Sequence, residues 1–237
     1  MTEINKSNDK CIDCGTTDDL RSKHPWNDVS YCEKCWEKEV QRCEEARERE
    51  EREARQLRHD HIFNERCPKT MQQLDRDHFP SDLDTYDAIM SAPLTDKGII
   101  ILGITGAGKS RTMWQLAKRL ITQDHRYVEI LEDCRFGRMI ECSYDNGMSG
   151  HDKLIDNFQR AEVLMIDDLG KAKMTARVET DLFAIIDYRY AEGSPTVITT
   201  QFIGETLLRR FACKETGAAI VRRIKEVNDG FCLAVPA

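Results

Sequence analysis

The sequence lacks a long hydrophobic run, an apolar leader and a net positive charge. None of its apolar stretches approaches the roughly 18 to 20 residues that a membrane helix needs, which excludes a membrane-spanning protein. Its opening residues, MTEINKSNDK, contain no segment that could act as a signal peptide, so we expect a cytoplasmic protein whose ten cysteines are not a disulfide scaffold. The 35 basic and 42 acidic residues give a net charge of −7, which argues against a protein that coats duplex DNA without sequence preference. A local basic site is compatible with this charge.

The 237 residues suffice for one domain of about 150 to 200 residues and a small appendage. Three segments differ in composition, and we predict a cysteine module at residues 1–36, a charged helical linker at residues 37–66 and an α/β domain at residues 67–237. In the linker, acidic residues repeatedly precede arginines by four positions, which favours a solvated helix that spaces two modules. A helical seam for a partner is the alternative. The acid-first pairs are Glu45 with Arg49, Glu48 with Arg52, and Glu51 with Arg55.

Two C-x-x-C pairs, Cys11 with Cys14 and Cys32 with Cys35, are separated by 17 residues. This spacing is typical of a structural zinc site, in which four thiolates close the tetrahedron and leave no catalytic position. A domain of fewer than about 40 residues usually needs a metal or disulfides to fold, and zinc would supply that stability here. We expect His24 to be a surface or packing residue rather than a ligand. Three aromatic residues are predicted to cover the cluster, with stacking on nucleic-acid bases or docking of a partner as the alternative: Trp26, Tyr31 and Trp36.

Beyond residue 67, apolar strand-like runs alternate with amphipathic helical segments, which predicts an α/β domain with a mainly parallel sheet flanked by helices. Two stripes at helical spacing are predicted to face the core, one at Met113, Leu116, Ala117, Leu120 and Ile121, the other at Val178, Leu182, Ile185 and Ile186. The predicted strands cover residues 99–102, 127–131, 163–166, 196–199 and 231–235.

Directly after the first of these strands, the segment GITGAGKS fits the pattern G-x-x-x-x-G-K-[ST] of a phosphate-binding loop, and a helix follows it. Glycines at positions 103, 106 and 108 permit backbone angles and close approaches that let successive N–H groups surround phosphates. Lys109 is predicted to neutralise the β and γ oxygens, and Ser110 to offer its hydroxyl to Mg²⁺. The complete predicted nucleotide-binding set is Gly103, Ile104, Thr105, Gly106, Ala107, Gly108, Lys109, Ser110 and Arg111.

A second strand, VLMIDD, ends in two carboxylates, as a Walker B strand does. We predict that Asp167 takes part in holding Mg²⁺ and that Asp168 polarises the attacking water. A third strand, PTVITTQ, ends in polar residues, of which Gln201 is the candidate sensor of the γ-phosphate. Hydrogen bonding at the strand end is the alternative for that residue.

The chain from residue 67 onward resembles the AAA+ ATPase domain of bacterial helicase loaders of the DnaC type and the closely similar IstB transposition ATPases. The resemblance rests on GITGAGKS, VLMIDDLG, PTVITTQF followed by ETLLRRF, and GAAIVRRIKE. It implies an ATPase of the P-loop class that uses ATP and Mg²⁺. Because the sequence stops at Ala237, directly after the last predicted strand, we also expect no C-terminal helical lid, which loaders of this type lack.

Two residues depart from the family pattern. Asp168 stands where loaders usually have Glu, so hydrolysis is expected to be slow, and Gln201 stands where Asn is common. The family also carries an arginine that completes the site of a neighbouring subunit, and Arg223 is the best match for it. Arg222 is the rival, because it falls nearly opposite the apolar face of its helix. A solvated surface arginine is the alternative for both residues. An arginine supplied in this way would make turnover depend on assembly into a homo-oligomer.

The resemblance further implies that the cysteine module binds a replicative helicase, and it makes Arg135 and Arg138 the candidates for contact with single-stranded DNA. Plain exposed arginines are the alternative for these two residues. The leading hypothesis is therefore a helicase loader that acts in DNA replication, and an IstB-like helper of transposition is its nearest alternative. An ATP-gated adaptor and a small-molecule kinase are further alternatives. The paired Asp167 and Asp168 disfavour the kinase, because kinases exclude the water that these carboxylates would position.

Overall fold

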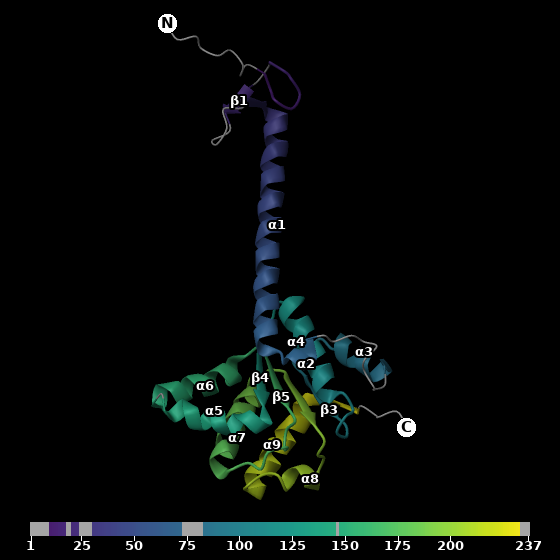
Figure 1. The fold of residues 1–237 in the computed structure, drawn as a ribbon, viewed down its shortest axis with the longest axis vertical. Coiled ribbons are helices and arrows are strands. Elements are labelled where there is room, and N and C mark those ends of the chain that lie inside the picture. The colour runs from purple at the N-terminus through teal and green to yellow at the C-terminus, as the bar shows by residue number, and fades with distance from the viewer. Residues whose placement is uncertain (1–9, 18–19, 24–29, 73–82, 146, 233–237) are drawn as a thin grey trace. The chain divides into compact units, whose positions relative to one another are not determined.

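The computed structural model describes residues 10–17, 20–23, 30–72, 83–145 and 147–232 of the chain. It separates into two compact units, Met1–Arg58 and His59–Ala237. Each unit contains its own sheet, and the strands and helices carry the labels of Figure 1. Among the residues described, no helix has both the length and the apolar character that crossing a membrane demands.

The first unit contains a two-stranded antiparallel sheet and most of a long helix. Strand β1 (Leu20–Lys23) pairs with β2 (Ser30–Cys32), and helix α1 (Glu33–Arg66) begins at the next residue. Helix α1 includes the charged segment that the sequence predicts to be helical.

The predicted ion pairs of α1 form only in part. Glu48 and Arg52 pair at 2.9 Å in the acid-first order. Arg49, which was expected to pair with Glu45, instead lies 3.9 Å from Glu53, one turn further along the helix. Exposed pairs of this kind are worth about 0.3 to 0.5 kcal/mol in either arrangement, so energy does not select one partner strongly.

A five-stranded parallel sheet forms the centre of the second unit. Its strand order is β4-β5-β6-β3-β7, and every neighbouring pair is parallel. The predicted α/β class is therefore confirmed, and each predicted strand has a counterpart in the sheet. The strands are β3 (Gly98–Leu102), β4 (Val128–Glu132), β5 (Val163–Asp167), β6 (Thr196–Thr200) and β7 (Asn228–Cys232).

The boundaries of the last strand differ from the prediction. Strand β7 begins at Asn228, three residues earlier than expected, and residues 233–235 of the predicted strand lie outside the described residues. Its first residues, Asn228, Asp229 and Gly230, are polar or lack a side chain. They are tolerated because β7 is an edge strand whose Asp229 and Gly230 are exposed, so hydrophobicity does not mark where the strand starts.

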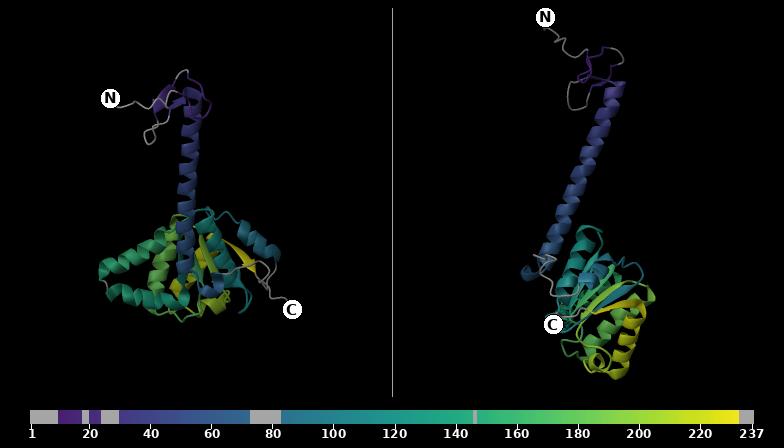
Figure 2. Two further views of the ribbon diagram at one scale, coloured as in Figure 1. Left: turned by 45° about the horizontal axis from the view of Figure 1, so that its top comes forward. Right: turned by 90° about the vertical axis from the view of Figure 1, so that its right-hand side faces the viewer.

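Helices cover both faces of the sheet (Figure 2), and each face has its own apolar core. Helices α3 and α4 pack on one face, and α5 to α9 contribute to the core on the other. The helices of this unit, besides the end of α1, are α2 (Lys69–Gln72), α3 (Leu83–Ser91), α4 (Lys109–Thr122), α5 (Asp133–Asp145), α6 (Met148–Arg160), α7 (Ala176–Ala191), α8 (Glu205–Leu208) and α9 (Lys214–Val227).

Strand β5 shows how the two cores share one sheet. Val163 and Met165 belong to the first core, and Leu164 and Ile166 belong to the second. A strand buried on both faces reads as a continuous apolar run, which is why VLMI could be recognised from the sequence. The two predicted helical stripes also face these cores, with Met113 in α4 and Ile185 in α7 fully buried.

One buried arginine of α7 forms hydrogen bonds to two other segments beside the second core. Arg189 of α7 is 1% exposed, and burial lowers its pKa to about 10, which leaves it charged at neutral pH. No carboxylate is recorded beside it among the described residues; its guanidinium donates instead to carbonyls at the end of α6 and in front of β6, and to one hydroxyl. The acceptors are the carbonyls of Phe158, Gln159, Ala161 and Pro195 and Oγ1 of Thr196, at 2.6 to 3.1 Å.

We expect Arg189→Met to destabilise the second unit by at least about 3 kcal/mol, because it leaves several buried carbonyls without donors. The midpoint of urea unfolding, followed by circular dichroism, measures the loss. The control is Arg160→Met on α6, which removes an exposed arginine paired with Asp156 and should change stability by no more than about 0.5 kcal/mol. Equal midpoints for both variants would contradict the role of Arg189.

Candidate functional site

The loop between β3 and α4 adopts the backbone that its glycines were predicted to permit. Gly106 and Gly108 have φ of +88° and +83°, in the left-handed region that residues with a Cβ rarely enter. Gly108 is the N-cap of α4 and no side chain caps the helix, so the first N–H groups of α4 are available to an anion. Gly103 is not among the residues of positive φ, and its N–H donates to the carbonyl of Thr200 on β6.

Lys109 is the first residue of α4, and its side chain folds back into the loop. It is 6% exposed, and its Nζ donates to the carbonyl of Ile104 at 3.0 Å. A buried ammonium held by one loop carbonyl has further donors to offer, and a phosphate oxygen is a suitable acceptor.

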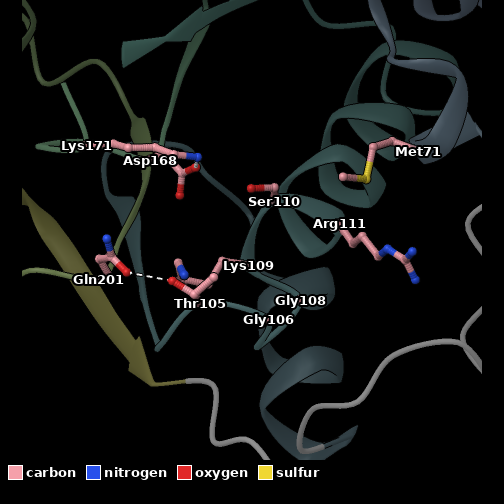
Figure 3. A pocket seen from close by; sticks show the side chains of 10 residues that line it. All are labelled: Met71, Thr105, Gly106, Gly108, Lys109, Ser110, Arg111, Asp168, Lys171 and Gln201. Atoms are coloured by element: carbon pink, nitrogen blue, oxygen red, sulfur yellow. Dashed lines mark hydrogen bonds and ion pairs between the residues drawn. The ribbon is translucent and has the colours of Figure 1, made fainter. Parts of the chain in front are cut away.

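A cavity of about 540 Å³ opens beside this loop. Figure 3 shows the loop and the start of α4 with Asp168, Lys171 and Gln201 on one side and Met71 of α2 on the other. The predicted loop residues divide into two groups. Three of them do not line the cavity: Gly103, Ile104 and Ala107. The side chain of Ile104 is exposed, and that of Ala107 is fully buried in the core. The lining residues are Met71, Thr105, Gly106, Gly108, Lys109, Ser110, Arg111, Asp168, Lys171 and Gln201.

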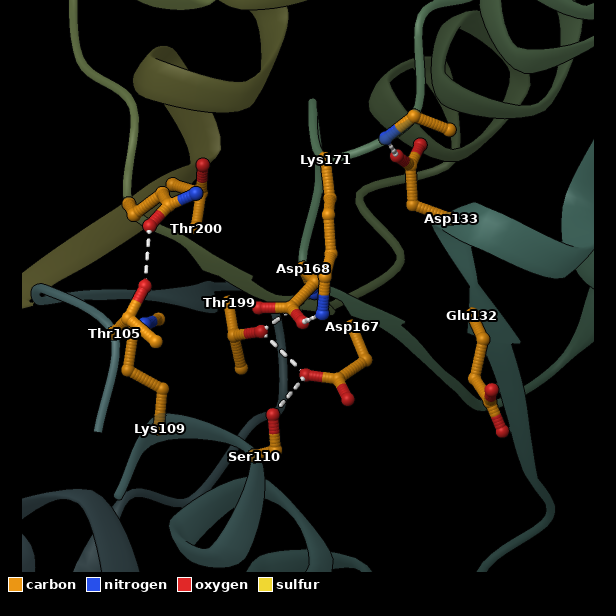
Figure 4. A network of polar contacts seen from close by, with 12 residues as sticks. Thr105, Lys109, Ser110, Glu132, Asp133, Asp167, Asp168, Lys171, Thr199 and Thr200 are labelled. Atoms are coloured by element: carbon orange, nitrogen blue, oxygen red, sulfur yellow. Dashed lines mark hydrogen bonds and ion pairs between the residues drawn. The ribbon is translucent and has the colours of Figure 1, made fainter. Parts of the chain in front are cut away.

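Asp167 lies at the end of β5 and accepts two hydroxyl hydrogen bonds, shown in Figure 4. Ser110 Oγ donates to Asp167 Oδ1 at 2.8 Å, and Thr199 Oγ1 donates to the same oxygen at 2.6 Å. Burial raises the pKa of Asp167, and the two hydroxyls offset part of this effect. No lysine or arginine forms an ion pair with it among the described residues. A carboxylate and a hydroxyl placed together without a cation could hold Mg²⁺, which prefers oxygen ligands.

Asp168 follows directly and faces the cavity from a strained backbone. Its φ is +56°, its N–H donates to Thr199 Oγ1 at 2.8 Å, and its Oδ2 accepts from Lys171 Nζ at 2.6 Å. Sequence reasoning missed Lys171. The signal that could have found it is the run D-L-G-K, in which a glycine turn brings a cation back to the acid three residues before it.

Gln201 lies just beyond the end of β6 and contacts the phosphate-binding loop. Its Oε1 accepts from Thr105 Oγ1 at 2.9 Å, and both side chains line the cavity. The structure thus brings the predicted loop, Asp168 and Gln201 to one cavity, with Asp167 bonded to Ser110 at its wall. Met71 also lines it, but nothing in the sequence marks a residue so far ahead of the loop.

The two rival arginines of α9 differ in their surroundings. Arg223 is held inside the molecule: its guanidinium pairs with Asp187 at 2.6 Å and stacks on the ring of Phe183, and its side chain is 16% exposed. Arg222 is 63% exposed and lies 3.9 Å from Glu226. Arg222 is therefore the arginine that can reach another molecule without breaking a close ion pair.

The two arginines predicted to contact DNA lie on α5. Arg138 is exposed, and Arg135 is exposed beside Glu132 of β4, with which it pairs at 3.1 Å. They are one turn apart on the same helix, and the acidic partner of Arg135 reduces its positive field.

The cysteine cluster lies in the first unit. The sulfur atoms of Cys11, Cys14, Cys32 and Cys35 lie within 4.8 Å of one another, and those of Cys14 and Cys32 are 3.6 Å apart. A tetrahedral zinc with bonds of about 2.3 Å separates its sulfurs by about 3.8 Å, so the cluster could form a zinc site. Backbone hydrogen bonds, chiefly from Cys32, lower the pKa of Cys11 to about 6, whereas the side-chain hydrogen bond with Cys32 and burial raise the pKa of Cys35 to about 12.

Of the predicted covering residues, Tyr31 and Trp36 contact each other, with ring centroids 6.1 Å apart. His24 and Trp26 lie outside the described residues.

Comparison with known families gives one match, to the family model described as IstB-like ATP binding protein, over residues 27–227. No curated protein matches the chain. Several solved structures match its fold. The structure of the DnaC helicase loader is 20% identical, with a TM-score of 0.56, and the match covers 70% of this chain and 99% of that one.

A putative primosome component from Streptococcus pyogenes is 23% identical, with a TM-score of 0.54 and coverage of 73% and 93%. The replication initiator DnaA bound to AMPPCP and single-stranded DNA is 14% identical, with a TM-score of 0.51, and the match covers 65% of this chain but only 44% of DnaA. At these identities the structural matches establish the fold, and the family model establishes a P-loop ATPase.

Proposed function

The chain belongs to the family of IstB-like ATP-binding proteins, and from this membership we propose that it is an ATPase that delivers a hexameric replicative helicase to single-stranded DNA. The observation that carries the proposal is the extent of the fold match. The match covers 99% of the chain in the structure of the DnaC helicase loader and 70% of this chain.

In this proposal the cavity binds ATP. The N–H groups at the start of α4 and the ammonium of Lys109 bind the phosphates, because both are donors without a full set of acceptors. Asp168 polarises the attacking water. Gln201 contacts the γ-phosphate and links it to the phosphate-binding loop through the hydrogen bond with Thr105. Met71 offers an apolar surface to the base.

Ser110 and Asp167 would hold Mg²⁺. When bound, the ion would neutralise the charge that develops on the phosphate oxygens. The hydrogen bond between Ser110 and Asp167 supports this pairing, since it already brings two oxygen ligands into contact. Thr199 holds Asp167 from the neighbouring strand β6 and would keep the carboxylate oriented toward the ion.

We assign the arginine that acts on a neighbouring subunit to Arg222, in place of the Arg223 that the resemblance favours. A catalytic arginine must reach the γ-phosphate of another chain. For Arg223 this would cost the close pair with Asp187 and leave that carboxylate without its cation. Arg222 would give up only a pair at 3.9 Å.

The cysteine cluster is proposed to bind zinc and to fold the first unit, which would then contact the helicase. The thiol-only ligand set supports zinc, since soft thiolates select it over Mg²⁺ or Ca²⁺. The separation of the chain into two compact units supports a division of labour between partner binding and ATP hydrolysis.

A helper ATPase of transposition is the second candidate, favoured by the description of the family model itself. Both candidates use the same ATP site, so the partner distinguishes them. The deciding experiment captures partners on the purified full-length chain, with ATP, at about 150 mM salt, where screening suppresses contacts between distant surface charges.

We expect a hexameric helicase to co-purify with the wild-type chain. It should be lost with Lys109→Ala, because the phosphates lose their cation and ATP binding fails. Isothermal titration of ATP checks that binding, and Lys118→Ala, an exposed lysine on the same helix, should bind ATP as the wild type does. A transposase in place of the helicase would establish the second candidate, and retained ATP binding by Lys109→Ala would contradict the assignment of the site.

For Arg222→Ala we expect ATP turnover to fall by at least about 100-fold at concentrations where chains associate, with unchanged ATP affinity, because a trans arginine acts on the transition state. Steady-state release of phosphate measures it, and Lys225→Ala on the same helix is the charge-matched control. If Arg223→Ala abolishes turnover without loss of stability while Arg222→Ala does not, the role belongs to Arg223.

Purified full-length chain should contain about one zinc per molecule by elemental analysis. We expect Cys35→Ser to lower that content sharply and to leave the unfolding of the second unit unchanged, because a tetrahedral site loses one of its four ligands. Cys43→Ser, which alters an exposed thiol outside the cluster, should keep its zinc. Equal zinc contents in the two variants would rule out the cluster as the metal site.

A further inference from the structure

The loop after Asp168 places a lysine on the carboxylate that the proposed reaction uses. Lys171 Nζ lies 2.6 Å from Asp168 Oδ2, and both side chains line the cavity (Figure 3). The hydrogen bond and the charge of Asp168 raise the pKa of Lys171, so the ammonium stays protonated. Asp168 therefore faces the cavity with one oxygen already occupied by a charged donor.

The backbone of this loop is fixed by contacts with three other segments of the chain: α5, β6 and the residues after α8. The carbonyls of Gly170 and Lys171 accept from the guanidinium of Arg210 at 2.5 and 2.7 Å, and the N–H of Ala172 donates to Asp133 Oδ2 at 2.7 Å. Leu169 makes two hydrogen bonds to β6: its N–H donates to the carbonyl of Thr199, and its carbonyl accepts from Thr200 Oγ1. The position of the lysine thus follows from the fold rather than from the side chain alone.

Gly170 shows how closely the loop is packed. It has φ of +86°, and a Cβ there would lie 2.9 Å from Leu207 and 3.1 Å from Phe202. Asp168 itself has positive φ, a conformation that costs free energy and persists only where surrounding contacts hold it. Asp168 begins the turn and Gly170 lies within it, and both are held in conformations that leave little room for change. This turn brings the ammonium of Lys171 to the carboxylate of Asp168.

We propose that Lys171 is a positioning residue that restrains ATP hydrolysis by holding Asp168 in an ion pair. This inference rests on the proposed role of Asp168. In the reaction, the water oxygen forms a bond to the γ-phosphorus, and the bond from that phosphorus to the βγ-bridging oxygen breaks with its electrons leaving on ADP. The water proton moves to a carboxylate oxygen of Asp168 and passes on to the released phosphate.

The ammonium opposes that transfer because it occupies Oδ2 as a hydrogen-bond donor, which leaves Asp168 only one oxygen that can accept the water proton. Lys171 also contributes positive charge to a cavity that would hold a triphosphate, so it favours binding of ATP. One side chain therefore strengthens substrate binding and slows the chemical step.

The test is Lys171→Met in the full-length chain, with kcat and KM for ATP measured separately. We expect kcat to rise about two- to fivefold, the range for a half-exposed ion pair, and KM to rise as well. Lys171→Arg keeps the charge and should lie closer to the wild type than Lys171→Met. Lys173→Met removes the same charge from an exposed position two residues further along the loop and should leave both constants unchanged. A kcat for Lys171→Met that is unchanged or lower overturns the inference.

Asp168→Asn separates this inference from the proposed function. If Asp168→Asn lowers turnover strongly and Lys171→Met does not raise it, only the restraint is wrong. If Asp168→Asn leaves turnover unchanged, the role of Asp168 fails and the restraint fails with it. The double variant gives the most decisive test. The rise in kcat caused by Lys171→Met should vanish in the Asp168→Asn background, because the lysine acts through that carboxylate. A gain that persists there contradicts the mechanism.

Discussion

The burial of phosphate charge by main-chain N–H groups is the constraint on which the rest of the second unit depends. Such groups can surround an anion only if the chain turns sharply between β3 and α4, and Gly106 and Gly108 take the positive φ that this turn needs. The helix that follows begins at Lys109 and leaves its first N–H groups uncapped. Its Met113 and Leu116 are fully buried, so the core fixes the direction in which those donors point.

Strand order then decides which side chains meet the phosphates. Because β6 lies between β3 and β5, the residues at its end stand between the loop and the carboxylates. Thr199 uses one hydroxyl to donate to Asp167 and to accept from the N–H of Asp168, and Gln201 reaches Thr105 on the opposite side. Under the proposed function, these contacts of a single strand end would connect the loop that binds the phosphates with both carboxylates.

The features that could be predicted from the sequence are those written in local patterns. The phosphate-binding loop, the C-x-x-C pairs and the doubly buried strand VLMI each combine residue type with fixed spacing, and all appear in the structure as expected. The features that could not be predicted depend on contacts across the chain. Nothing near Arg223 indicates that Asp187 holds it, and Arg189 gives no sign of its five distant acceptors. The polar residues that begin β7 can be recognised as part of a strand only once the strand is known to lie at the edge of the sheet.

The loop that carries Lys171 also connects the ATP cavity to α5. Asp133 is the first residue of α5, it is 5% exposed, and its carboxylate holds the N–H of Ala172, the residue next to Lys171. Burial raises the pKa of Asp133 to about 6. The hydrogen bond from Ala172 to Asp133 therefore couples the first turn of α5 to the loop that carries Lys171. Under the proposed function, a ligand bound at Arg135 and Arg138 of α5 would be linked to Asp168 through this hydrogen bond and the ion pair between Lys171 and Asp168.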